Sequence, residues 1–268
     1  MTRIIAVTNQ KGGVGKTTTS VNLAAAFARA GQRVMLVDLD PQGNATMGSG
    51  VDKRNAHRTV YHVLLGLADV IAARTRSQSG GYDLLPANRD LAGAEIELVG
   101  LDNREGRLRE ALAVVASEYD FIIIDCPPSL SLLTINGLVA AQAVLIPMQC
   151  EYYALEGLSD LVGTIKRVRA HLNPSLDIAG LLRTMYDPRN TLSQQVSQQL
   201  ESHFGDKVYQ TMIPRNVRLA EAPSYGAAAV VWDDTSKGAQ AYLALAEEIL
   251  ARGKSELRGG AKTAMEAT

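Results

Sequence analysis

Cysteine is scarce in this sequence, and large aromatic residues are few, with only three Phe and one Trp. The two cysteines, Cys126 and Cys150, do not form a CxxC pair. The sequence therefore predicts no disulfide framework and fits a reducing compartment, the cytoplasm. Uninterrupted apolar runs of transmembrane length are also missing, so we expect no membrane-spanning helix.

Neither sign of charge dominates the chain. It has 27 Lys and Arg against 28 Asp and Glu, which gives a formal net charge of −1. Residues 1–150 hold 14 basic and 14 acidic side chains, and residues 151–268 hold 13 and 14. General electrostatic attraction to nucleic acid is therefore excluded, and any DNA-binding surface must be a local patch.

Short β-branched runs alternate with longer helical patterns along the chain. Several runs, such as VMLV and FIII, are apolar throughout, which is typical of strands buried on both faces of a parallel sheet. We expect strands at Arg3–Thr8, Arg33–Asp38, Tyr82–Pro86, Asp120–Asp125, Ala143–Gln149, Asp177–Tyr186 and Lys207–Ile213. We expect helices at Thr18–Ala30, Arg104–Ser117, Leu155–His171 and Ser236–Ala251. This alternation predicts an α/β fold with a doubly wound, mostly parallel sheet flanked by helices, and one site at the strands' carboxyl ends.

The chain shows no internal repeat and no linker, so we expect a single domain over residues 1–252. Residues 253–268 are rich in Gly, Ala, Lys and Thr without an apolar stripe, and they predict a disordered tail. Leu257 and Met265 are the only bulky apolar residues of this tail. It cannot bury a useful apolar face, so we expect no membrane anchor there.

The stretch NQKGGVGKTT, residues 9–18, follows an expected strand and opens an expected helix. In that context glycine-rich backbone N–H groups and a helix N-terminus predict a phosphate-binding loop. Lys16 would reach the β- and γ-phosphates, and the Thr17 hydroxyl would bind Mg²⁺. The alternative is a glycine-rich turn with incidental lysines. The remaining nucleotide-contacting positions are expected to be Lys11, Gly12, Gly13, Val14, Gly15 and Thr18.

Two acidic strand ends accompany this loop. In LVDLDPQG, Asp38 and Asp40 end the second strand, and Asp40 is placed to orient or deprotonate a water near a γ-phosphate. The alternative is that Asp40 caps its own turn. In FIIIDCPPSL, Asp125 ends an apolar strand, which is the Walker B arrangement for holding Mg²⁺. Cys126 beside it could be a ligand, but packing is the commoner role for such a thiol.

Taken together, KGGVGKTT, LVDLDPQGNAT, FIIIDCPPSL and CEYYALEG resemble the ParA/Soj chromosome-partitioning ATPases. That family belongs to the deviant Walker A group of P-loop proteins, with MinD and the nitrogenase iron protein. The likeness continues through AGAEIEL, LLTINGL and IPRNVRLAEAPS and covers the chain up to about residue 251. The resemblance implies ATP and Mg²⁺ as cofactors and a slow ATPase that dimerises on ATP.

The resemblance also implies roles for individual residues. Lys11 becomes the signature lysine, a cation that crosses to the partner's phosphates when the dimer forms; without the resemblance it is a solvated loop lysine. Gly12 allows the partner's loop to approach closely. Asp40 positions the hydrolytic water, and Thr17, Asp40 and Asp125 serve the metal. Pro214 and Asn216, in IPRN, match positions that contact adenine.

For partners, the resemblance implies non-specific double-stranded DNA and a ParB-type protein that stimulates hydrolysis, and so a nucleoid-associated protein. Arg189 and Arg218 match DNA-binding arginines of the family, and Arg215 and Lys237 are further candidates. The alternative for any of them is a solvated surface charge. A MinD-like or cargo-positioning ATPase, acting on a membrane or protein surface, is the alternative function.

Two relatives of other function are disfavoured. An iron-protein reductase would bridge a [4Fe–4S] cluster with two cysteines per subunit, but Cys126 and Cys150 lie in partition-type motifs. A small-molecule ligase would need a substrate pocket, and no convergent polar set beyond the nucleotide site argues for one. The sequence leaves open whether the cargo is a chromosome, a plasmid or a protein cluster.

Overall fold

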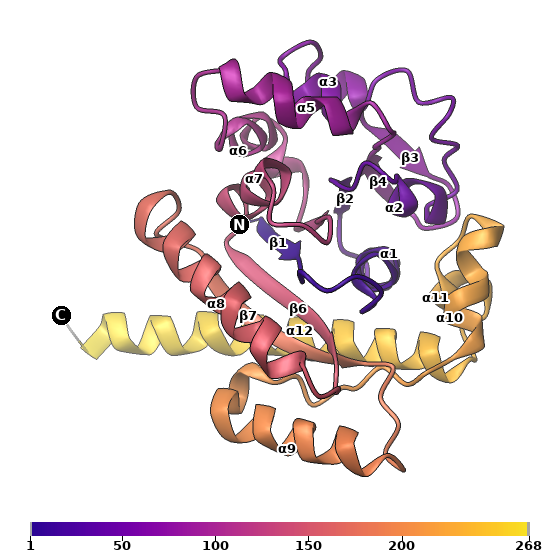
Figure 1. Ribbon diagram of the computed structural model, residues 1–268, viewed down its shortest axis with the longest axis vertical. Helices are drawn as coiled ribbons and strands as arrows, with labels where there is room; N and C mark the ends of the chain where they lie inside the picture. Colours follow the sequence, from indigo (N-terminus) through magenta and orange to yellow (C-terminus); the bar gives the residue numbers. More distant parts are fainter. Residues whose placement is uncertain (1, 267–268) are drawn as a thin grey trace.

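A seven-stranded sheet forms the centre of the molecule in the computed structural model, which describes the backbone of residues 2–266 (Figure 1). The strand order is β3-β4-β2-β5-β1-β6-β7, and every pair is parallel except the antiparallel pair β3–β4. The strands are β1 Arg3–Val7, β2 Val34–Asp38, β3 Thr75–Ser77, β4 Tyr82–Leu85, β5 Phe121–Asp125, β6 Ala143–Gln149 and β7 Asp177–Thr184. The doubly wound, mostly parallel α/β fold is thereby confirmed.

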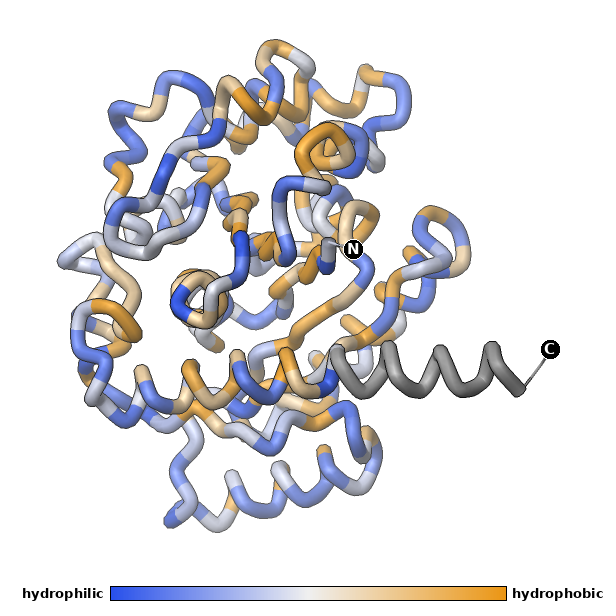
Figure 2. Tube along the Cα trace, turned by 180° about the vertical axis from the view of Figure 1, so that it is seen from behind, coloured by the Kyte–Doolittle hydropathy of each residue, from blue (hydrophilic) through white to orange (hydrophobic). Residues whose placement is uncertain are grey.

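Helices cover both faces of this sheet, because successive strand side chains point to opposite sides. In β1, Ile4 and Ala6 belong to one apolar cluster and Ile5 and Val7 to the other. The second cluster lies under α1 Lys16–Arg29, α11 Ala229–Trp232 and α12 Lys237–Glu266. The first lies under α3 Val60–Leu64, α5 Leu91–Glu97, α6 Arg107–Ala113, α7 Leu132–Ala140, α8 Ala154–His171 and α9 Thr191–Phe204. Figure 2 shows the apolar strands inside this polar shell.

Short helices complete the chain at the edges of the sheet. They are α2 Asn44–Gly48, α4 Val70–Ala73, α10 Val217–Glu221, and the 3₁₀ turns η1 Leu98–Gly100, η2 Ala116–Glu118, η3 Gly205–Lys207 and η4 Ala222–Tyr225. Of the helices described, none combines the length and apolar content that crossing a bilayer requires.

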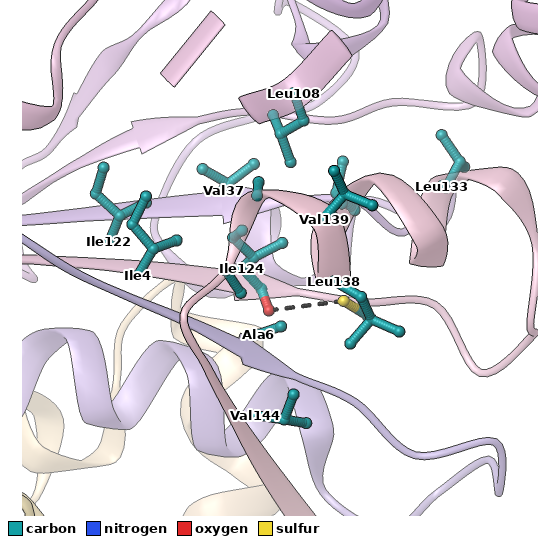
Figure 3. Packing of buried hydrophobic residues seen from close by; sticks show 14 of the residues in the cluster. Ile4, Ala6, Val37, Leu108, Ile122, Ile124, Leu133, Leu138, Val139 and Val144 are labelled. Atoms are coloured by element: carbon teal, nitrogen blue, oxygen red, sulfur yellow. Dashed lines mark hydrogen bonds between the residues drawn. The ribbon is translucent and has the colours of Figure 1, made fainter. Parts of the chain in front are cut away.

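The buried contact between β5 and α7 explains Cys126. Its thiol lies under α7 and donates to the Ile124 carbonyl at 3.9 Å (Figure 3). The side chain is buried, and burial raises the pKa of the thiol, which disfavours the thiolate needed for metal binding. Packing is therefore the role that the structure supports for Cys126.

The predicted strand Lys207–Ile213 is wrong. Val208 forms a single bridge to Leu181. Beyond this bridge, side chains form hydrogen bonds with backbone groups that would pair with β7 if the segment were a strand. The Arg183 guanidinium donates to the carbonyl of Tyr209 at 2.6 Å. The Glu248 carboxylate accepts the N–H groups of Gln210 and Thr211, at 2.9 and 3.0 Å. The segment follows the edge of β7 without extending the sheet.

Other boundaries also differ from expectation: α1 begins at Lys16 and α12 runs to Glu266, past the expected Ala251. The helix predicted at Arg104–Ser117 is shorter, because the Asn136 side chain accepts the N–H of Leu108 and donates to the Arg104 carbonyl, which sets the start of α6. Strand β7 ends at Thr184, and Met185 takes a left-handed conformation with φ 48°. Within α12, side chains are described up to residue 253. Apart from that residue, the tail predicted for residues 253–268 lies outside them and stays a prediction.

Candidate active site

The loop after β1 is shaped for an anion. Gly13 and Gly15 have φ of 74° and 89°, a left-handed conformation that glycine adopts without strain. Gly15 precedes α1 and has no side chain to cap it, so the first N–H groups of that helix remain available to a ligand. The Lys16 ammonium folds back over the loop and donates to the Lys11 carbonyl at 3.0 Å.

Neighbouring strand ends hold this loop in place. The Thr184 hydroxyl, at the end of β7, donates to the Val14 carbonyl at 2.8 Å. The Asn9 amide donates to the Pro147 carbonyl of β6 at 2.8 Å. These buried bonds fix the loop against two strands that are distant in sequence, which preorganises its N–H groups.

Asp125 lies under the loop, at the end of β5. Its two carboxylate oxygens accept hydrogen bonds from the hydroxyls of Thr17 and Ser20, each at 2.8 Å. Asp125 is fully buried, and burial together with the neighbouring Asp38 raises its pKa to about 8, against the opposing effect of the two hydroxyls. A cation beside this carboxylate would restore its charged form.

The donor set fits Mg²⁺ better than a metal held by the protein alone. Carboxylate and hydroxyl oxygens are the ligands this ion prefers, and it commonly takes one or two carboxylates with phosphate and water. Among the side chains described, no group of three or more His, Cys, Asp and Glu is arranged to hold a metal ion. Thr17 and Asp125 could therefore share a magnesium ion with a bound nucleotide.

The two aspartates after β2 have different environments. Asp38 is buried and accepts the N–H and the hydroxyl of Thr46, both at 2.8 Å, which anchors α2. Burial raises the pKa of Asp38 to about 6. Asp40 is half-buried, and its Oδ1 accepts the N–H of Gln42 at 2.9 Å, the turn contact of the alternative interpretation. Its charge also acts on Lys16, so it lies at the rim of the same site.

Lys16 is buried, and burial lowers the pKa of its ammonium, while the charges of Asp125 and Asp40 oppose that shift. Lys11 is exposed and forms an ion pair with Glu151, which follows β6. At Gly12 an added Cβ would meet nothing within 4 Å. The small size of Gly12 is therefore not required by contacts within one protomer.

A pocket of about 210 Å³ opens beside the phosphate loop. Its floor includes Thr18 and Tyr242, and the buried Tyr242 hydroxyl lies 3.0 Å from that of Thr19. Pro214 and Asn216 line its wall. The remaining lining residues are Gly15, Met185, Ile213, Arg215, Leu219 and Ala220. The pocket is mostly apolar with a few polar groups, as a flat heterocyclic base requires.

The four expected DNA contacts lie on the segments that form this wall or adjoin it. Arg215 lines the pocket. Arg218 is the second residue of α10, and its N–H donates to Asn216 Oδ1 at 2.9 Å. Arg189 lies after β7, and Lys237 opens α12, where a Cβ on Gly238 would come within 3.2 Å of Asn216. All four are exposed.

Several contacts at the site were not anticipated. Ser20 follows Thr17 by one helical turn, a spacing that could have indicated it as a second hydroxyl on Asp125. Glu151 and Thr184 contact the loop although they lie more than a hundred positions away in sequence, and no local pattern points to them.

The second cysteine, Cys150, is also buried, and burial raises the pKa of its thiol to about 11.

Comparison with known proteins places this geometry among nucleotide-binding chains. Residues 2–178 match a family model described as an AAA domain. The chain is 56% identical to the sporulation initiation inhibitor protein Soj of Bacillus subtilis, over 94% of this chain and 100% of that protein. It is 51% identical to the chromosome partitioning protein ParA of Caulobacter vibrioides, over 93% and 94%. A crystal structure described as cobyrinic acid a,c-diamide synthase from Mycobacterium smegmatis, with bound ADP and magnesium, is 43% identical, with a TM-score of 0.84 and coverage of 96% and 97%.

Proposed function

The chain belongs to the ParA/Soj family of chromosome-partitioning ATPases, and we propose that it is a DNA-binding switch whose ATP-bound dimer holds DNA and releases it after hydrolysis. One observation carries the proposal: Thr17, Ser20 and Asp125 meet under a loop that also presents Lys16 and Lys11. The curated relatives named for partitioning are more similar to this chain than the structure named as a synthase, which favours partitioning.

The phosphate loop binds the nucleotide in this proposal. N–H groups of Gly13 to Thr18 surround the phosphates, and the Lys16 ammonium turns from the Lys11 carbonyl to the β- and γ-phosphates. Phosphate oxygens next to Lys16 favour its charged form, against the lowering of its pKa by burial. Pro214 and Asn216 hold adenine in the pocket between them and Thr18.

Thr17 and Asp125 would hold Mg²⁺, with Asp40 at the rim. When bound, the ion would neutralise charge on the phosphate oxygens. Ser20 keeps the Asp125 carboxylate oriented through its hydrogen bond. Asp40 orients the attacking water, and its bond to Gln42 fixes the turn that presents it.

Lys11 makes hydrolysis depend on a second copy of the chain. It is exposed and sits on the loop facing solvent, so its ammonium can reach a nucleotide held by a partner protomer. Gly12 has open space beside it, which suits close approach of the partner's loop. A cation delivered only in the dimer stabilises the transition state as an arginine finger does.

In the ATP-bound dimer, Arg189, Arg215, Arg218 and Lys237 contact DNA phosphates without reading sequence. Two protomers present twice the number of basic side chains, so the dimer binds more tightly than a monomer. A ParB-type protein stimulates hydrolysis and ends the bound state. The protein then acts in the cytoplasm, associated with the nucleoid.

The first experiment measures binding to random-sequence duplex DNA with ATP, with ADP and without nucleotide, each at low and high salt. We expect binding with ATP alone, weakened by salt because phosphate contacts release counterions. Absence of DNA binding in all three states, with ATP hydrolysis intact, would replace this proposal with a MinD-like or cargo-positioning ATPase that acts on a membrane or protein surface.

Two substitutions test the site itself. Lys16→Ala should abolish ATP binding, and a variant that hydrolyses ATP normally refutes the assignment of the phosphate loop. Asp40→Ala should bind ATP, dimerise and remain on DNA, because only water activation is lost. If Asp40→Ala fails to dimerise in analytical ultracentrifugation with ATP, the turn contact to Gln42 is its main role.

A further inference from the structure

Two of the three arginines proposed to contact DNA, Arg189 and Arg218, are paired with carboxylates of the same chain. Arg189 is 89% exposed, yet its guanidinium forks onto Asp187, with Nε and Nη2 at 3.0 and 2.9 Å from the two carboxylate oxygens. Arg218 is paired twice, with Glu221 at 2.9 Å and Asp233 at 3.2 Å. A bidentate carboxylate presents the same pair of oxygens to an arginine as a phosphate does.

These pairs lie on neighbouring segments. Tyr186 bridges Pro214, and its N–H donates to the Ile213 carbonyl at 3.0 Å, so the chain at 184–190 runs beside the chain at 213–218. The charge of Arg215 reaches Asp187 and, after the bond from Arg189, contributes to lowering its pKa to about 2. Asp187 therefore stays ionised at every pH at which DNA binding is measured.

An aromatic pair fixes the second arginine. The Arg218 guanidinium lies 5.5 Å from the centre of the Trp232 ring, and Tyr225 stacks on that ring at 4.5 Å. A guanidinium held over an aromatic face and between two carboxylates has few conformations to lose. The Arg218 guanidinium is therefore already positioned in the absence of DNA, and its N–H groups are paired with Glu221 and Asp233.

We propose that Asp187, Glu221 and Asp233 are internal competitors of DNA phosphate: they neutralise Arg189 and Arg218 in the single protomer and must be displaced when DNA binds. This inference rests on the DNA-binding function proposed above. Each displacement reduces the gain from one phosphate contact. A monomer, with one set of contacts, is thereby kept off DNA, and the dimer binds because its two sets act together.

The size of the effect follows from the exposure of these pairs. Exposed ion pairs are weak, and each is equivalent to about a 1.5- to 5-fold change in an equilibrium constant. Both protomers contribute, so removing one carboxylate per protomer should tighten DNA binding by the ATP-bound dimer by roughly 2- to 25-fold. The gain should shrink at high salt, because screening weakens exposed pairs.

The test compares Asp187→Asn and Glu221→Gln with the unchanged protein in DNA binding with ATP and with ADP. Asparagine keeps the oxygen that accepts the Arg189 N–H in the turn, so the loop keeps its shape while the charge is removed. We expect tighter binding with ATP, a smaller gain of about 1.5- to 5-fold with ADP, where one protomer acts alone, and an unchanged rate of ATP hydrolysis without DNA.

The chain contains a matched control. Asp52 forks onto Arg54 with the same spacing, and its Oδ1 likewise accepts the N–H of that arginine, at 3.0 Å. Asp52→Asn changes the net charge equally, on a loop that the proposal does not place on DNA. If Asp52→Asn tightens DNA binding as much as Asp187→Asn, or if Asp187→Asn has no effect, the competition is refuted. If neither the unchanged protein nor any variant binds DNA in any nucleotide state, the proposed function fails, and the inference falls with it.

Discussion

The contact between Gly137 and Cys126 allows a quantitative test of the core beside the site. A Cβ added at Gly137 would lie 2.9 Å from the Cys126 sulfur and 3.2 Å from Leu39 Cδ1. Both neighbours are buried, and Cys126 follows the carboxylate that lies under the phosphate loop. Figure 3 shows the surrounding cluster, with Ile124 of β5 and Leu138 of α7 among its labelled residues. The cysteine that follows Asp125 therefore limits the size of the side chain that α7 can have at position 137.

Two effects of Gly137→Ala oppose each other. Overpacking in a closed core costs about 1–3 kcal/mol. Alanine in the interior of a helix stabilises it by about 1 kcal/mol relative to glycine. We therefore expect Gly137→Ala alone to lower the free energy of unfolding by up to about 2 kcal/mol. In the Cys126→Ala background it should raise it by up to about 1 kcal/mol, because the sulfur is gone and only the contact with Leu39 remains tight.

The assay is chemical denaturation of the four proteins of this double-mutant cycle, without nucleotide. Helix propensity contributes equally in both backgrounds and cancels, so the coupling reports the steric contact with the sulfur alone, and we expect up to about 3 kcal/mol. Gly163→Ala is the control, because Gly163 lies in α8 and an added Cβ there meets nothing within 4 Å. It should stabilise both backgrounds equally. An equal effect of Gly137→Ala in both backgrounds refutes the steric argument.

Two further predictions concern buried polar groups. Ser20→Ala removes one of the two hydroxyls on Asp125, and hydrogen bonds to charged groups contribute about 1.5–3 kcal/mol, so Mg²⁺-dependent ATP affinity should fall roughly tenfold or more by calorimetry. Unchanged affinity would mean that Thr17 alone positions the carboxylate. Arg183→Met removes donors from the Tyr209 carbonyl and from Glu201, and should lower the free energy of unfolding by about 2–3 kcal/mol. Glu201→Gln should cost less, because Glu201 is half exposed; equal costs contradict this account.

The sequence was most informative where local pattern and long-range structure agree. Apolar β-branched runs identified β1, β2, β5 and β6 within about one residue of their ends, because strands buried on both faces have little freedom in composition. Strand β3, with the sequence TRS, was missed because only Ser77 is buried and its partner β4 determines its conformation. Residues 207–213 have the sequence pattern of a strand, but the side chains of Arg183 and Glu248 form hydrogen bonds with their backbone groups.

Within the site, the phosphate loop and the acidic strand ends could be located from motifs, because their spacing along the chain reflects the turn that they form. The contacts that position this loop and these strand ends could not be predicted from motifs. Glu151 beside Lys11, and Thr184 beside Val14, join residues that only the sheet topology brings together. The ion pair between Arg218 and Asp233 is equally invisible in sequence, since Asp233 follows another helix, α11.

The base pocket has a consequence for how specificity can change. Its wall comes from Met185 and residues 213–220, beyond residues 2–178 that match the family model, whereas the phosphate loop lies within that range. Under the proposed function, phosphate binding and base recognition would therefore depend on separate stretches of the chain. If the pocket holds the base as proposed, substitution in the later stretch should change which base is bound while the phosphate loop keeps its own contacts.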